Sequence, residues 1–189
     1  MSPNDSATGM LRDQHQKILK IAGVLQEVLG NEAEPGMYDY DAISDCIDFI
    51  RLYADALHHG EEEDLLFVEL EAAGMPRHTG PIAVMLNEHA QGRAFVKAMV
   101  ASLPAAREGD VDSQGELRRM GFGYVHLIRA HILKEDNILF EVADQMMEGP
   151  TCRSLCSAYE GMCQRRFEGC TVAELEAILA RLLEKYPDA

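Results

Sequence analysis

The order of apolar and polar residues along the chain indicates helices. No run in which apolar and polar residues alternate one by one is long enough to predict a strand. Glycine, proline and short polar groups separate the apolar segments at wide intervals, as they do between helices. The predicted long helices cover residues 7–29, 39–73, 81–103 and 112–148.

The residues at the ends of these segments are ones that commonly begin or end helices. The first turns begin at aspartate, serine or proline: Asp39 or Asp41, Pro81, and Asp112 or Ser113. The helices stop at glycine or proline: Gly30, Gly74 with Pro76, Pro104, and Gly149 with Pro150. The segment 32–37, which contains a Pro-Gly pair, is predicted to be a loop.

The last part of the chain, from Thr151 onward, is predicted to form one or two shorter helices. Thr171 and Glu174 have the spacing of a capping box, which marks a new helix start. Four long helices with short connections favour an all-α fold, an antiparallel four-helix bundle. We expect residues 1–148 to form this bundle and residues 149–189 to form a helical extension packed on it.

Two segments of the chain repeat a pattern of histidine, glutamate, leucine and phenylalanine. The segment His58-His-Gly-Glu-Glu-Glu-Asp-Leu-Leu-Phe67 matches His131-Ile-Leu-Lys-Glu-Asp-Asn-Ile-Leu-Phe140 at an offset of 73 residues. Two further histidines keep nearly the same register, since His89 lies 74 residues after His15. Each half of the chain therefore supplies a lone histidine on one helix and a His-x-x-x-Glu on the next.

This spacing suits metal binding, because residues four apart on a helix lie on one face. Helix bundles build sites for two metal ions from inward-facing histidine and carboxylate side chains. Two related halves predict a pseudo-twofold site with one metal ion per half. Imidazole and carboxylate ligands suit iron, and also manganese or zinc. No cysteine falls within the repeat, which argues against an iron–sulfur cluster there.

These segments, with Asn87-Glu88-His89, resemble the hemerythrin-like (HHE) cation-binding family. The similarity spans about residues 11–145, and Gly80-Pro-Ile-Ala-Val-Met-Leu-Asn-Glu-His-Ala-Gln-Gly-Arg93 is similar in detail to the third helix of bacterial members. The resemblance implies a four-helix bundle with a non-haem di-iron site. Carried over to this sequence, the ligands are His15, His58, Glu62, His89, His131 and Glu135.

Four other residues are expected to contact the ligands rather than the metal: His59, Glu63, Arg93 and Tyr124. His59 and Glu63 also have ligand spacing, but Glu62 and Glu135 each lie five residues before the matching phenylalanine, which favours His58 with Glu62. Tyr124 lies two helical turns before His131; a hydroxyl that donates to a bound oxygen and a satisfied core tyrosine are both open for it.

The chain departs from oxygen-carrying hemerythrins at two places. Arg93 stands where those proteins have a second histidine, one turn after the third-helix ligand, and the fourth helix has His-x-x-x-Glu in place of His-x-x-x-x-Asp. The expected site is therefore one imidazole poorer, which weakens an inference of reversible oxygen carriage. Arginine does not ligate a metal as a cation, so Arg93 is expected to pair with a carboxylate, contact an anion or leave the pocket.

Composition narrows the partners and the compartment. A net charge of −15 argues against nucleic acid and against anionic membrane as partners. The chain has no apolar run long enough to span a membrane, its start is polar and unlike a signal peptide, and five cysteines fit reduced thiols in the cytoplasm. Four of them have the spacing of a packing stripe, with thiol redox signalling or a second metal site as the alternative: Cys152, Cys156, Cys163 and Cys170.

Two functions remain open at this point. The first is a di-iron protein that binds or reacts with oxygen, peroxide or nitric oxide, as a sensor, scavenger or carrier, with an electron donor that the sequence leaves unknown. The second is an iron-binding module for storage, delivery or repair without redox turnover. The oligomeric state is not predicted.

Overall fold

A computed structural model describes residues 6–30, 38–147 and 149–189. The predicted loop at 32–37, the predicted helix end at Glu148 and the first five residues lie outside this described part. Within it the chain is all-α, and the β-type pairing is limited to an isolated bridge between Phe167 and Cys170. Among the described residues, no helix is both long and apolar enough to cross a membrane.

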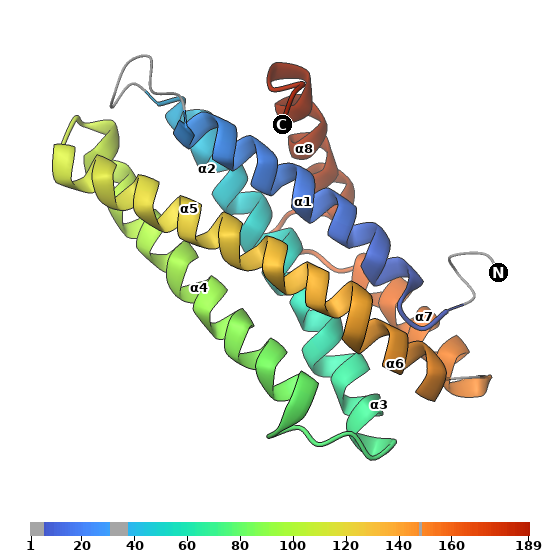
Figure 1. Cartoon of the computed structure of the whole chain (residues 1–189). Coiled ribbons are helices and arrows are strands. Elements are labelled where there is room, and N and C mark those ends of the chain that lie inside the picture. Colours follow the sequence, from blue (N-terminus) through green and yellow to red (C-terminus); the bar gives the residue numbers. More distant parts are fainter. Residues whose placement is uncertain (1–5, 31–37, 148) are drawn as a thin grey trace.

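Four long helical rods make up most of the fold (Figure 1). The first rod is α1 (Gly9–Gly30) and the third is α4 (Gly80–Arg107). The second rod is continuously helical and consists of α2 (Tyr40–Phe49), η2 (Ile50–His59), η3 (Glu62–Leu66) and α3 (Phe67–Ala72). The fourth rod consists of α5 (Val111–Lys134), η4 (Glu135–Leu139) and α6 (Phe140–Met146), where η marks the wider π-helix.

Most of the predicted helix ends are confirmed, with two corrections. Asp39 caps α2, since its side chain accepts from the Ala42 N–H at 3.1 Å. Asp110, and not Asp112 or Ser113, caps α5 and accepts from the backbone of Ser113 at 2.8 Å. The predicted end of the third helix at Pro104 is wrong, because α4 continues to Arg107. Pro104 has no backbone N–H, so the carbonyl of Val100 loses its hydrogen-bond donor. Val100 is exposed, and the helix tolerates this loss.

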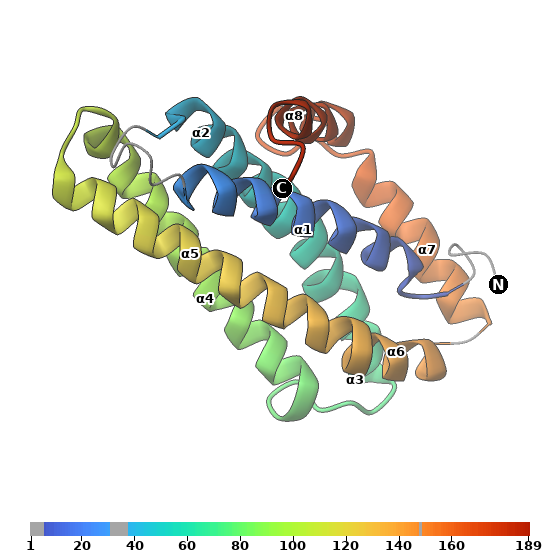
Figure 2. The same ribbon diagram turned by 45° about the horizontal axis from the view of Figure 1, so that its top comes forward.

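The rods form a ring of contacts in which each packs against two others. α1 contacts α2 and α5, and α4 contacts α2 and α5. Figures 1 and 2 show that rods consecutive in the chain run in opposite directions. This ring encloses the space into which the inward faces of all four rods project.

Two shorter helices lie outside the ring, on the side of α1 and α2 (Figure 2). They are α7 (Pro150–Cys163), which contacts η3, and α8 (Val172–Lys185), which contacts α1, α2 and η2. The predicted capping box at the start of α8 is confirmed, with Thr171 and Glu174 each accepting from the other's backbone. The helices α7 and α8 therefore cover the outer face of the first two rods.

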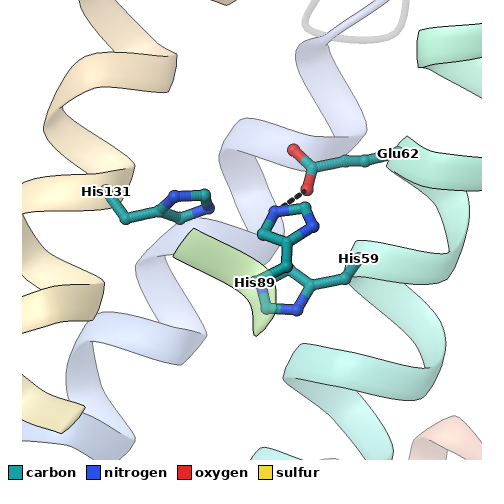
Figure 3. Close-up of side chains that lie close together, drawn as sticks. All are labelled: His59, Glu62, His89 and His131. Carbon is teal, nitrogen blue, oxygen red and sulfur yellow. Dashed lines mark ion pairs between the residues drawn. The ribbon is translucent and has the colours of Figure 1, made fainter. Parts of the chain in front are cut away.

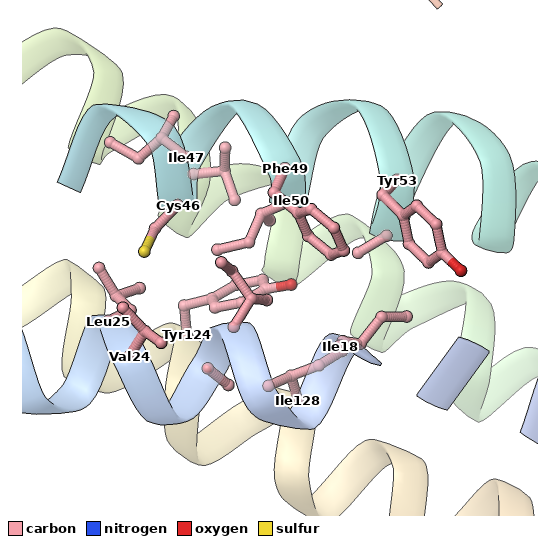
Figure 4. Packing of buried hydrophobic residues seen from close by; sticks show 14 of the residues in the cluster. Ile18, Val24, Leu25, Cys46, Ile47, Phe49, Ile50, Tyr53, Tyr124 and Ile128 are labelled. Atoms are coloured by element: carbon pink, nitrogen blue, oxygen red, sulfur yellow. The ribbon is translucent and has the colours of Figure 1, made fainter. Parts of the chain in front are cut away.

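The interior consists of two apolar clusters separated by a polar layer. The larger cluster contains Ile18, Leu57 and Ile128 together with the residues of Figure 4. The second contains Leu11, Leu66, Met85 and Leu139 among others. Along each rod, the histidines and glutamates of the repeat stand between these two groups. The apolar clusters thus seal the polar layer at both ends.

Candidate metal centre

The repeat in the sequence is also a repeat in local structure. A five-residue π-helix begins at Glu62 in the second rod and another begins at Glu135 in the fourth. In each, the backbone N–H of the matching phenylalanine donates to the carbonyl of the glutamate, five residues back: Phe67 to Glu62 and Phe140 to Glu135. Such wider turns are uncommon and are frequent at functional sites.

The longer π-helix η2 changes which histidines face inward. Its i→i+5 hydrogen bonds place more residues in each turn, so consecutive side chains are separated by a smaller angle than in an α-helix. As a result both His58 and His59 are buried, at 1% and 5% exposure. His59, which the register of Phe67 with Phe140 leaves outside the predicted ligands, lies among them in the structure.

Seven side chains come together in two groups able to hold a metal ion. One group is His59, Glu62, His89 and His131, drawn in Figure 3; the other is His15, His58, Glu62 and Glu135. In each group one ligand atom per residue lies within 4.8 Å of all the others. The structure therefore brings together all six residues predicted as ligands, and adds His59 as a fifth imidazole.

The two glutamates lie between the groups. Oε2 of Glu135 is 3.2 Å from Nε2 of His15 and 3.1 Å from Nε2 of His131. The two oxygens of Glu62 lie 3.7 Å from Nε2 of His58 and 3.3 Å from Nε2 of His89. Each carboxylate thus reaches one histidine of each group, which is the placement of a bridging ligand.

The donor atoms of this centre are buried and have no hydrogen-bond partner in the described part of the chain. They are Nε2 of the five histidines and both carboxylate oxygens of Glu62 and Glu135. Burying so many polar atoms without partners is costly. A pair of cations would supply the missing partner to every one of them, so the residues present fit a metal site.

The opposite ring nitrogen of each lone histidine is held by a residue of the other half. Nδ1 of His15 is 2.9 Å from Asp136, and Nδ1 of His89 is 2.8 Å from Glu63. Each of these acids directly follows one of the two central glutamates in the sequence. A carboxylate at Nδ1 fixes the tautomer and leaves the lone pair on Nε2, where a metal ion binds.

The matched phenylalanines pack on the same two imidazoles. Phe140 stacks on His15 at 5.2 Å between ring centres, and Phe67 stacks on His89 at 6.0 Å. The phenylalanine of each half therefore orients the lone histidine of the other half. This exchange ties the two halves of the repeat together around the centre.

The imidazoles of His58 and His131 are held by residues of their own half, and here the halves differ in charge. Nδ1 of His58 is 2.7 Å from the amide oxygen of Gln14, whose nitrogen donates to Glu61 at 2.7 Å. In the second half Nδ1 of His131 is 3.0 Å from Glu88, which is paired with Lys134. In the first half, His58 is therefore held by a neutral amide that is bonded to a buried acid. In the second half, His131 is held by a carboxylate that is paired with a cation.

The pKa values follow these contacts. Burial lowers the pKa of His15, but Asp136 and Glu135 outweigh it and raise that pKa to about 9. The same balance with Glu62 and Glu63 raises the pKa of His89 to about 9. Burial lowers the pKa of His58 to about 3. Metal binding at this centre must therefore displace protons from His15 and His89.

Arg93 pairs with carboxylates, the first of its three expected fates. Its Nε donates to Asp55 at 2.7 Å and its Nη2 to Glu63 at 2.8 Å. Glu63 in turn contacts His89, so Arg93 reaches the centre through that acid. Tyr124 is buried and its hydroxyl has no hydrogen-bond partner among the described residues.

The cysteines of the last segment do not form one helical stripe. α7 ends at Cys163, and Cys170 lies in the connection before α8. Cys152 is buried in the second apolar cluster, while the thiol of Cys163 donates to Glu61 at 3.8 Å. All are free thiols.

Comparison with known proteins places this site in a family. The pattern of the hemerythrin HHE cation-binding domain matches residues 6–143. An uncharacterised protein of Mycobacterium bovis and one of Mycobacterium tuberculosis are each 25% identical over 126 residues, or 67% of this chain. The chain spans about half the length of these relatives, with 49% of each covered. No solved structure matches it. With about three-quarters of its length matched, the chain belongs to the hemerythrin HHE cation-binding family.

Proposed function

We propose that this protein holds two iron ions in an antiparallel four-helix bundle formed by the four rods, and that the pair binds or reacts with a small oxidant. The observation that carries the proposal is the set of five imidazole nitrogens and four carboxylate oxygens that are buried, convergent and unpartnered in the described residues. Mixed imidazole and carboxylate ligands suit iron. Two carboxylates that each reach both groups suit a pair of ions better than a single one.

Iron bound here would supply a redox-active Lewis acid with coordination positions left open for a small ligand. The surrounding residues keep the imidazoles ready for it. Asp136, Glu63 and Glu88 accept from Nδ1 and so hold the Nε2 lone pairs toward the interior. The apolar clusters on both sides exclude bulk water from the polar layer.

A missing imidazole was the reason for doubting reversible oxygen carriage, and His59 removes that reason if it is a ligand. The sequence argument expected a centre one imidazole poorer than that of oxygen carriers. His59 lies in the group with His89 and His131 and brings the centre as a whole to five imidazoles. Carriage, sensing and scavenging of oxygen, peroxide or nitric oxide therefore all remain candidate functions, and one experiment distinguishes between them.

The second candidate is an iron store or delivery module without redox turnover. One observation favours it: Arg93, Glu63 and Asp55 form a charged group near the centre that is partly exposed to solvent. Glu63 and Asp55 in this group are carboxylates, which are ligands that a hydrated cation would meet beside the centre. A store would release its iron to a chelator quickly and would not react with oxidants.

The test is anaerobic stopped-flow mixing of the ferrous protein with oxygen, peroxide and nitric oxide in turn. We expect a rapid change in the visible absorption of iron with at least one of them. The variant Glu135→Gln should lose it, because Glu135 lies between both groups, while the exposed Glu141→Gln on the same rod should keep it. An absence of any optical reaction, with iron that exchanges freely, would establish the storage function instead.

A further inference from the structure

The centre is enclosed, so a ligand from solvent needs a passage to it. The seven side chains of the two groups are between 0% and 5% exposed. A cavity of about 380 Å³ lies between η2 and α4 and has His59 in its wall. This volume is within the range of small-molecule sites and far exceeds what one water molecule fills. The cavity therefore connects the outside of the bundle to one histidine of the centre.

Two residues of the cavity wall each have a polar atom that lacks a hydrogen-bond partner in the described part of the chain. Nε2 of His59 and the hydroxyl of Tyr124 are both buried and make no hydrogen bond within the described residues. In Figure 4 Tyr124 reaches across from α5 with its hydroxyl oxygen directed toward the Tyr53 end of the drawn segment. Burial raises the pKa of Tyr124 well above its ordinary value, so the phenol is neutral and available as a donor.

Gly92 keeps the space beside Tyr124 open. A Cβ atom at this position would lie 3.8 Å from Cε2 of Tyr124 and 3.8 Å from Cδ2 of Leu127. Those are ordinary contact distances, so a small side chain fits without strain, and a larger one would extend into the cavity. Glycine in the interior of a helix is less stable than alanine there, so its presence at this position favours the open space over helix stability.

The charged side chains that line the cavity are mostly cations, in a chain of net charge −15. They are Arg51, Arg93 and Lys97, against the single carboxylate of Asp55. Arg51 is paired with Asp48 and Glu168, and Arg93 with Asp55 and Glu63, all of which reduce their effect. Lys97 is exposed and has no ion-pair partner in the described part of the chain, so its charge is free to attract an anion.

We propose that a small inorganic anion enters through this cavity past Lys97 and receives a hydrogen bond from Tyr124 beside His59. The proposal rests on the proposed metal pair and adds the route, the charge class of the ligand and the residue that donates to it. The anion supplies the hydrogen-bond partner that the Tyr124 hydroxyl lacks among the described residues.

The experiment measures azide binding to the iron-loaded ferric protein, followed by the absorption that azide adds, with iron content determined for every variant. Two variants fill the route: Gly92→Leu inside the cavity, and Val100→Trp at its exposed wall in case the first does not fold. At unchanged iron content, we expect either one to slow azide binding by at least about tenfold. Azide binding at the wild-type rate in a folded, loaded variant would overturn the route.

Three further variants test the anion and its donor. Lys97→Gln should slow azide several-fold at low salt and leave nitric oxide, a neutral ligand, unchanged, whereas Lys20→Gln on the exposed face of α1 should change neither. Tyr124→Phe should speed azide release several-fold at unchanged iron content. Equal effects of Lys97→Gln on azide and nitric oxide would overturn the anion preference. A wild-type chain that takes up no iron would contradict the proposed function as a whole, a result distinct from all of these.

Discussion

The most informative residue is His59, because its position depends on a local helix geometry that the sequence does not reveal. His58 and His59 are neighbours in the chain and belong to different ligand groups. Regular α-helix would turn one of them away from the interior, and η2 turns both toward it. The centre therefore has five imidazoles arranged unequally, three in one group and two in the other.

His58→Ala and His59→Ala should each weaken metal binding, in contrast to the sequence argument, which expects His58 to matter far more. Each substitution removes one imidazole from a different group, so we expect iron content to fall toward about one ion per chain in both variants. The exposed His126→Ala should retain the wild-type content. Full iron content in His59→Ala would show that His59 lies near the centre without ligating.

Gln14 positions His58 without contacting the metal. Gln14→Leu removes the hydrogen bond at Nδ1 of His58 and leaves the buried Glu61 with only the weak donor of Cys163. Loss of such an outer partner typically weakens metal affinity about 10–100-fold, and we expect this range here by competition with a chelator. Gln16→Leu, exposed on the same helix, is the control and should have wild-type affinity. Equal affinities in the two variants would mean that His58 needs no such support.

The candidate site was largely predictable at the level of single residues. Two matched His-x-x-x-Glu segments and two histidines in register pointed to the six residues that the structure brings together. The register of Phe67 with Phe140 favours His58 over His59 as a ligand, but a register cannot show that η2 turns both neighbouring histidines inward, and π-helix carries no sequence signal that we could identify. The only hint was the pair of adjacent histidines itself.

At the scale of elements, the sequence predicts most helix boundaries, with one start and one end corrected by the structure. Caps such as Asp39 and Thr171 act through their own side chains, so their chemistry is readable locally. Pro104 was misread as an end, because whether a helix tolerates proline depends on which carbonyl loses its donor and whether that carbonyl meets solvent. That information exists only in the folded chain.

The contact between α2 and α8 gives a pH-dependent prediction. Burial acts to raise the pKa of Asp39, but Lys185, Tyr186 and the Ala42 N–H outweigh it and lower that pKa to about 2. A lowered carboxyl pKa contributes stability that is present above the ordinary value of 3.8 and is lost as pH falls through about 2. Asp39→Asn keeps the cap and removes the charge, so it should cost up to about 1 kcal/mol of unfolding free energy at pH 6.

Urea unfolding at pH 6 and near pH 2 measures this difference between wild type and Asp39→Asn. The difference should shrink at the lower pH, where about half of the wild-type carboxyl groups are protonated. Asp39→Ala should lose about 1 kcal/mol more than Asp39→Asn at both pH values, because it also removes the cap. A difference that is the same at both pH values would exclude the charge of Asp39 as its source.

At the scale of the whole molecule, the polar layer makes stability depend on the metal. The unpartnered donors lie between two apolar clusters, so the metal-free fold carries their desolvation cost. Ions that bind only the folded state stabilise it by about 2.7 kcal/mol at a hundredfold excess over their dissociation constant. For a chain of this size that corresponds to a melting temperature roughly 5–10 °C higher than in the metal-free protein.

Calorimetry before and after chelation checks this expectation, and re-addition of iron should restore the upper value. The same melting temperature in samples whose metal content is known to differ would indicate that the ions bind at the surface. The double variant His78→Ala, His126→Ala, changed only at exposed positions, controls for adventitious binding and should behave as the wild type.

The central claim is that one chain holds a pair of ions between Glu62 and Glu135. The most direct test is the iron content per chain after anaerobic loading and removal of loosely bound metal, measured by elemental analysis against quantitative amino-acid analysis. The account predicts two ions per chain, because both carboxylates reach a histidine of each group. A content that saturates at one ion, or at none, would contradict it.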